Sequence, residues 1–189
     1  MGWNAPGEML TVYVIVMLIG RAFSHGRRGR LPLAYGRAIL RDPTAILAGL
    51  AGALAVALPV LEAVQKDSSF RHSSCVGLAL ILVGHGVVYT ANSALGANWS
   101  PTIEKTEGHQ LVTGGIYGVI RHPLYLAGLL ITVGTNVYFA SSWSWIALLP
   151  VLAVLWIRIP MEEKQLVARF GERYTGYRKK TKAILPWLL

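Results

Sequence analysis

The sequence contains a single cysteine, Cys75, and few charged residues. One cysteine excludes an internal disulfide bond and any zinc site built from several cysteines, and no metal site is expected. Charged residues make up 14% of the chain and hydrophobic residues 53%, whereas soluble domains carry roughly 25% charged residues. The mean hydropathy is +0.47. We therefore expect an integral membrane protein and, with 189 residues, a single structural domain.

Five apolar runs predict membrane helices. They cover residues 9–23, 45–64, 74–95, 124–140 and 143–159. Runs of about 20 residues can cross the hydrocarbon core of a bilayer. Only Ser141 and Ser142 separate the last two runs, so their helices should form an antiparallel hairpin. The predicted fold is all-α, with about five transmembrane helices. Three of them belong to a membrane region, residues 1–95, and residues 96–189 form a catalytic region.

Two patterns predict how these helices continue and pack. Small residues recur every fourth position in the second run, at Ala45, Gly49, Ala53 and Ala57. Such a stripe favours close packing of another helix. After Pro160, which should prevent a fully regular helix, residues 161–182 are expected to form an amphipathic cytoplasmic helix. Its apolar positions are Leu166, Phe170, Tyr174 and Tyr177, and Gly171 should weaken it.

The distribution of basic residues predicts the orientation in the membrane. The connector 21–43 carries six arginines and one acid, and the chain from Arg158 onward carries eight basic residues and three acids. The opposite side receives only Lys66 and Arg71. This pattern is typical of cytoplasmic loops and places the amino terminus outside. The net charge of +9 is thereby explained without a nucleic-acid partner. A cleavable signal peptide is not expected, because no basic region precedes the first apolar run.

The stretch GHQLVTGGIYGVIRHPLY, residues 108–125, is a polar loop that leads into an apolar helix. Gly114 and Gly115 favour a tight turn, and Pro123 suits the first turn of a helix. Polar side chains crowd this helix start, at Tyr117, Arg121, His122 and Tyr125. A helix start offers free amide groups and a positive dipole end, which favour a small molecule with a carboxylate.

A second polar feature, Arg158-Ile-Pro-Met-Glu162-Glu163, ends the fifth run. Arg158 and Glu162 are four residues apart and share one face of a helix. The hairpin should bring this pair to the same membrane face as the helix start at Pro123. One interpretation is an ordinary salt bridge at a helix end. The other is a site that holds an amphoteric small molecule against a lipid-borne group.

Three segments together resemble the isoprenylcysteine carboxyl methyltransferases and their prokaryotic relatives, which are related to the phospholipid methyltransferases. The segments are GHQLVTGGIYGVIRHPLY, RIPMEE and FGERYTGYRKKTKAILP. The resemblance covers roughly residues 98–186. It implies a membrane enzyme in a prokaryotic plasma or inner membrane, with its site facing the cytoplasm. It also implies the cofactor S-adenosylmethionine, a lipophilic or lipidated substrate that enters from the membrane lipid, and no obligate protein partner.

The resemblance also implies individual roles. The residues expected to bind the cofactor are His109, Gln110, Leu111, Val112, Tyr117, His122, Pro123, Leu124, Tyr125 and Glu162. Glu162 would bind the amino group of the cofactor, and Arg158 would orient the acceptor group of the substrate. Arg158 and Glu162 are thus the expected catalytic pair.

The chemistry of the acceptor stays open at this point. A carboxylate such as a prenylcysteine α-carboxyl group would need alignment, which an arginine provides, but no general base. An amine or a thiol would have to lose a proton, for which His122, Tyr125 or Glu163 could serve.

Two other functions fit parts of the sequence. Sterol reductases share the Arg-His-Pro-Tyr turn and the late acid pair. However, they bind NADPH and have more transmembrane helices. A non-catalytic small membrane protein would use the same polar residues only to finish its helices.

Overall fold

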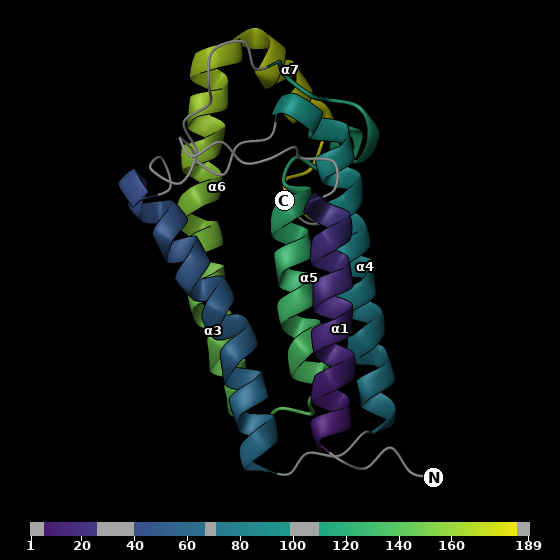
Figure 1. Cartoon of the computed structure of the whole chain (residues 1–189). Helices are drawn as coiled ribbons and strands as arrows, with labels where there is room; N and C mark the ends of the chain where they lie inside the picture. Colours follow the sequence, from purple (N-terminus) through teal and green to yellow (C-terminus); the bar gives the residue numbers. More distant parts are fainter. Residues whose placement is uncertain (1–5, 26–39, 67–70, 99–109, 185–189) are drawn as a thin grey trace.

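The computed structural model describes residues 6–25, 40–66, 71–98 and 110–184, and this part of the chain is helical (Figure 1). The α-helices are α1 (Pro6–His25), α3 (Pro43–Gln65), α4 (His72–Leu95), α5 (Pro123–Tyr138), α6 (Leu148–Phe170) and α7 (Glu172–Lys180). Short 3-10 helices are η1 (Gly96–Asn98), η2 (Gly115–Gly118) and η3 (Ser144–Ala147). Within the described ranges, β pairing is limited to one bridge between Ile120 and Lys182. The all-α prediction is confirmed.

Helices cover the predicted apolar runs, the fifth of them by η3 together with α6. Among the described residues, α3, α4 and the continuous segment Ser144–Phe170 are long and apolar enough to cross a membrane. Helix α5 is apolar but has only 16 residues. Helix α1 has 20 residues and covers the first predicted run, although it is not one of those three. The total of five spans therefore stays a prediction.

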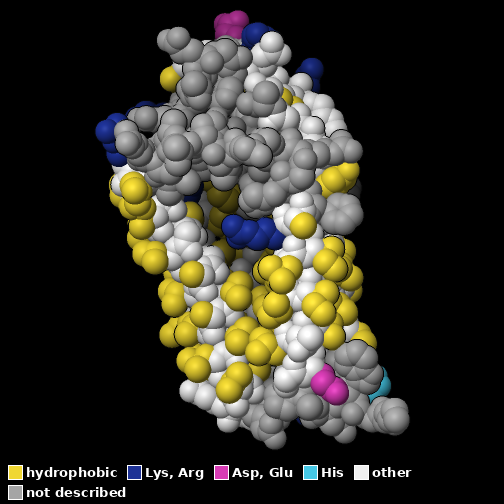
Figure 2. Space-filling view, in the orientation of Figure 1, with side chains coloured by type: hydrophobic (Ala, Val, Ile, Leu, Met, Phe, Trp, Pro, Cys, Tyr) yellow, Lys and Arg dark blue, Asp and Glu magenta, His cyan; other side chains and the backbone are white. Residues whose placement is uncertain are grey.

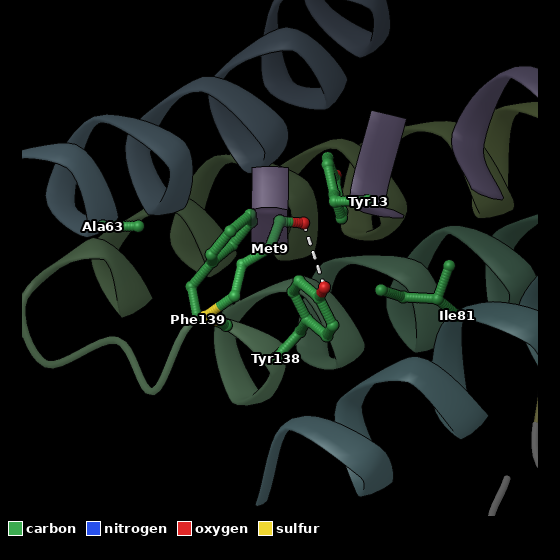
Figure 3. Packing of buried hydrophobic residues seen from close by; sticks show 6 residues of the cluster. All are labelled: Met9, Tyr13, Ala63, Ile81, Tyr138 and Phe139. Carbon is green, nitrogen blue, oxygen red and sulfur yellow. Dashed lines mark hydrogen bonds between the residues drawn. The ribbon is translucent and has the colours of Figure 1, made fainter. Parts of the chain in front are cut away.

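The helices form two groups that meet at the bend between α5 and α6. Helix α5 packs along α4, α1 packs on α4, and α3 packs on α6 (Figure 1). A buried cluster lies near the bend and contains Met9, Tyr13, Ala63, Ile81, Tyr138 and Phe139 (Figure 3). The hydroxyl of Tyr138 donates to the Met9 carbonyl at 2.9 Å. From this end the α3–α6 pair diverges from the group of α1, α4 and α5 (Figure 1).

Glu62, near the end of α3, holds the bend. Its side chain is 1% exposed, although it lies in an otherwise apolar helix. Its carboxylate accepts from the backbone amides of Ser142 at 2.7 Å and Ser144 at 2.8 Å. Lys66 donates to the same carboxylate at 2.6 Å. The predicted hairpin is thus stabilised by a buried acid from a third helix.

The small-residue stripe of α3 does not pack against another helix in the described part of the chain. Gly49, Ala53 and Ala57 are exposed, and a side chain added at Gly49 would meet nothing within 4 Å. A close helix contact lies instead between Gly77 of α4 and Gly134 of α5. A Cβ atom at Gly77 would lie 2.3 Å from the backbone nitrogen of Tyr138. Spacing showed which residues share a face, but not which face meets a neighbour.

The boundary between the fifth run and the tail also differs from the prediction. Helix α6 continues through Pro160 and ends only at Phe170. The amphipathic tail is therefore divided between α6 and α7. Gly171 separates the two helices with a φ of +53°, a conformation that glycine adopts readily. Glycine rather than proline sets the boundary here.

Candidate functional site

The carboxyl-terminal segment holds the loop before α5 in place. The amide of Arg121 donates to the Lys182 carbonyl at 2.8 Å, and the amide of His122 donates to the Ala183 carbonyl at 2.9 Å. Gly115 has a φ of +60°, which permits the turn into η2. Pro123 is the first residue of α5, and His122 precedes it as the N-cap residue. The carboxyl-terminal segment, distant in the sequence, thus fixes the loop at the start of α5.

A cavity of about 280 Å³ opens beside the start of α5. Its wall comes from α3, the end of α4, η1, the loop before α5, α5, α6 and α7. The loop and α5 contribute Gln110, Leu111, Val112, Tyr117, Arg121, His122, Pro123, Leu124 and Tyr125, and the other walls contribute Ala45, Ala48, Leu95, Asn98, Arg158, Glu162, Leu166, Phe170, Tyr174 and Tyr177. Figure 2 shows a hollow between the two helix groups, with apolar side chains around it and a Lys or Arg side chain at its mouth.

One tyrosine hydroxyl connects the two charged residues of α6. Arg158 Nε donates to Tyr125 Oη at 3.2 Å, and Tyr125 Oη donates to Glu162 Oε2 at 3.1 Å. Arg158 is only 7% exposed. The three side chains therefore form a hydrogen-bonded chain along the cavity wall, with a cation at one end and a carboxylate at the other.

The amino end of α3 binds the other side of Arg158. Arg158 Nη1 donates to Thr44 Oγ1 at 2.9 Å and lies 3.7 Å from Asp42 Oδ2. Asp42 also caps α3, because its carboxylate accepts from the amides of Thr44 and Ala45. Burial acts to raise the pKa of Asp42. The hydrogen bonds from Thr44 and Ala45 and the charge of Arg158 outweigh burial and lower this pKa below its ordinary value.

His122 lies between two carboxylates. Its Nε2 is 3.3 Å from Glu163 Oε1 and its Nδ1 is 3.7 Å from Glu162 Oε2. Burial alone would lower the pKa of His122. The hydrogen bonds and charges of Glu162 and Glu163 outweigh burial and raise this pKa above its ordinary value. The site therefore favours an imidazolium at this position.

Glu163 ties the loop to α7. Its carboxylate accepts from Arg121 Nε at 2.8 Å and lies 3.1 Å from Arg178 Nε. Arg121 also donates to the backbone carbonyls of Thr181 and Arg178. With His122 included, three cationic side chains surround this one carboxylate. Glu163 therefore acts as a structural anchor on the side of α6 next to Glu162.

Aromatic side chains close the part of the cavity next to α7. Tyr177 donates its hydroxyl to the Tyr117 carbonyl at 2.6 Å, and the ring of Tyr177 lies 5.8 Å from the ring of Tyr174. Burial raises the pKa of the Tyr174 hydroxyl. Among the described residues this buried hydroxyl has no hydrogen-bond partner.

The structure brings nearly all the predicted site residues to one cavity. Every predicted binding residue lines it except His109, which lies outside the described residues. The sequence predicts that Leu166, Phe170, Tyr174 and Tyr177 form a face toward the core or lipid. These residues are buried or half-buried, and they also line the cavity. Sequence reasoning missed the contributions of α3 and of Leu95 and Asn98. In the described ranges, no group of three or more acidic, cysteine or histidine side chains could hold a metal ion.

The fold matches that of a solved membrane methyltransferase. The structure of a eukaryotic intramembrane Ras methyltransferase, an isoprenylcysteine carboxyl methyltransferase, superposes with a TM-score of 0.61. The match covers 96% of this chain and 67% of that one, at 20% identity. The chain thus has the fold of an integral membrane protein, as its composition predicted.

Sequence comparison defines the family. The phospholipid methyltransferase family model matches residues 73–173. Protein-S-isoprenylcysteine O-methyltransferase B of Arabidopsis thaliana is 33% identical over 145 residues, covering 72% of this chain and 74% of the relative. The Xenopus laevis protein-S-isoprenylcysteine O-methyltransferase is 32% identical over 121 residues, which cover 61% of this chain and 41% of that longer protein. The chain therefore belongs to the phospholipid methyltransferase family, as a relative of the isoprenylcysteine O-methyltransferases.

Proposed function

We propose that this chain is a membrane-embedded methyltransferase that uses S-adenosylmethionine and acts on a lipophilic carboxylate, such as a prenylcysteine α-carboxyl group. One observation carries the proposal. Arg158 and Glu162 lie on consecutive turns of α6 and are joined through the Tyr125 hydroxyl, on the wall of a cavity lined by the predicted loop residues. In this arrangement the Arg158 guanidinium, which would bind the methyl acceptor, lies beside the Glu162 carboxylate, which would bind the methyl donor.

The side chains of the cavity fit the chemistry of the cofactor. When bound, S-adenosylmethionine supplies an electrophilic methyl group on a positively charged sulfur. Glu162 would bind its ammonium group, and the aromatic rings of Tyr117, Phe170 and Tyr174 offer faces for an adenine ring or a cation.

The hydrogen bonds of the site favour a carboxylate over an amine or a thiol. An amine or thiol acceptor needs a base, but Glu163 is surrounded by three cationic side chains. The environment of His122 raises its pKa and favours the protonated form, and the Tyr125 hydroxyl already donates to Glu162. A carboxylate needs no base. Arg158 can align it with the methyl group, and a site at the membrane edge excludes water around the reacting charges.

The position of the cavity supports access from the bilayer. Ala45 and Ala48 of α3 form part of its wall, and the surrounding surface is apolar (Figure 2). The basic segments predict that this end of the bundle faces the cytoplasm and that the amino terminus lies outside. The cavity position supports a lipid or lipidated substrate, and the resemblance of the sequence motifs is the basis for proposing a prokaryotic plasma membrane and no obligate protein partner.

The two other functions lead to different binding results. A sterol-reductase-like protein would bind NADPH and ignore S-adenosylmethionine. A non-catalytic membrane protein would bind neither. The methyltransferase names of the relatives support the first proposal, and calorimetric titration of the purified protein with both cofactors separates all three.

Two substitutions test the proposed roles. Glu162→Ala should weaken S-adenosylmethionine binding at least about a hundredfold, because it leaves the ammonium group without its carboxylate. Arg158→Ala should keep cofactor affinity but reduce methyl transfer to a small farnesylated cysteine by about a hundredfold or more. Glu172→Ala and Arg173→Ala, both exposed on α7, are matched controls. Unchanged cofactor affinity in Glu162→Ala would contradict the assignment. Labelled donor added to a host lipid extract would then identify the natural acceptor.

A further inference from the structure

The orientation of Arg158 depends on a helix that lies far away in the sequence. Thr44 is 114 residues from Arg158 along the chain, yet its hydroxyl accepts a hydrogen bond from Arg158 Nη1 at 2.9 Å. On the other side of the guanidinium, Arg158 Nε donates a hydrogen bond to Tyr125 Oη. Within the described part of the chain no hydrogen bond engages Nη2. Because Arg158 lines the cavity, this nitrogen remains available to an acceptor.

The direction of the Thr44 hydroxyl is itself fixed. Thr44 Oγ1 donates its only proton to Asp42 Oδ1 at 2.6 Å. Its lone pairs can therefore only accept, and the partner they meet is Arg158. Asp42 is held in turn by the α3 amides that it caps. The first turn of α3 thus presents an oriented acceptor to the guanidinium, supported by the Asp42 charge at 3.7 Å.

We propose that Thr44 is a positioning residue for methyl transfer, which fixes the rotation of the Arg158 guanidinium so that Nη2 meets the acceptor. This role rests on the proposed function, because it concerns the same reaction. It assigns a part of the reaction site to α3, a helix whose residues carry none of the motifs of the loop or the tail. Thr44 acts through Arg158 and does not touch the cofactor, so its effect should fall on transfer and leave cofactor binding intact.

The test compares three variants of the full-length protein in detergent or nanodiscs. Thr44→Val removes the hydroxyl and keeps the shape, and Thr44→Ser keeps the hydroxyl. Thr90→Val is the matched control, because Thr90 is exposed on α4 and its hydroxyl bonds only to its own helix. We expect Thr44→Val to lower kcat for a farnesylated cysteine by about tenfold to a hundredfold, the effect of losing one hydrogen bond to a charged group. Thr44→Ser should restore most of this loss, and cofactor affinity should stay within about twofold in all variants.

A second measurement separates positioning from general destabilisation. The lysine side chain of an Arg158→Lys variant lacks the planar guanidinium fork. Adding Thr44→Val to this variant should therefore lower kcat by a much smaller factor than it does in the parent. Three results would overturn the positioning role in a parent that transfers methyl groups. They are an equal decrease of kcat in both backgrounds, a decrease that Thr44→Ser shows as well, and an unchanged kcat in Thr44→Val. A parent that transfers no methyl group to carboxylate, amine or thiol probes would instead overturn the proposed function, and this role with it.

Discussion

The hydroxyl of Tyr125 donates to Glu162 Oε2 at 3.1 Å while it accepts from Arg158 Nε at 3.2 Å. One proton position therefore couples the carboxylate and the guanidinium. This neutral hydroxyl links the two charged groups, which also have separate charged neighbours, Asp42 beside Arg158 and His122 beside Glu162. The two ends of the proposed reaction site are thus organised before any ligand binds.

Replacing Tyr125 with phenylalanine should disconnect these two ends. The ring would still fill its place, but Glu162 and Arg158 would each lose a hydrogen bond worth about 1.5–3 kcal/mol. We expect methyl transfer to fall about tenfold or more, with weaker cofactor binding. Steady-state kinetics and calorimetric titration measure both effects. Tyr138→Phe, which removes a hydroxyl in the buried cluster near the bend, should lower stability but leave cofactor affinity unchanged. If both substitutions affected binding equally, the bridge would have no special role.

His122 should make stability depend on pH. Its pKa is raised above the ordinary 6.5, so the folded state holds the proton more tightly than the unfolded state. Its contribution is complete below about pH 6.5 and is lost as the pH rises through the folded pKa. The midpoint temperature of thermal unfolding in detergent should therefore decrease as the pH is raised from 6 to 9. His122→Gln should flatten this dependence, whereas His72→Gln, at the exposed start of α4, should keep the slope of the parent. A parent midpoint that rises with pH would be the opposite result.

Removing the Glu62 carboxylate should destabilise the bend. Glu62→Ala leaves the amides of Ser142 and Ser144 without their acceptor, in a place where the acid is 1% exposed. We expect a loss of about 3 kcal/mol, the usual cost of breaking a buried charged group away from its partners. Chemical unfolding in mixed micelles gives the value. The exposed Glu172→Ala serves as control and should change stability by less than about 0.5 kcal/mol. A similar small change for Glu62→Ala would show that the bend holds without it.

Two glycines of α4 should respond in opposite ways to the same substitution. A methyl group at Gly77 would lie 2.3 Å from the backbone of α5, whereas one at Gly86 would meet nothing within 4 Å. Gly77→Ala should therefore force α4 and α5 apart and cost about 2 kcal/mol. Gly86→Ala should be neutral or stabilise the helix by up to about 1 kcal/mol. Unfolding curves of the two variants under one condition test the contrast, and equal effects would contradict the close contact.

Local pattern predicted the parts of the site that lie near one another in the sequence. The four-residue spacing of Arg158 and Glu162 placed both on one face, and Pro123 marked the start of α5. It could not predict the contact of Thr44 with Arg158, because that contact joins residues 114 positions apart. Nothing in an Asp-Pro-Thr sequence separates this helix start from an ordinary one. Glu62 did carry a signal, an acid inside an apolar run.

Helix α6 runs without a break from Leu148 to Phe170, and this continuity sets how the reaction site responds to its surroundings. Arg158 and Glu162 are separated along the axis by about 6 Å through backbone geometry alone. When α6 tilts or slides to match a thinner or thicker bilayer, the groups proposed for acceptor and donor move as one rigid unit. Their mutual spacing then survives changes in lipid composition that would shift residues carried on separate helices.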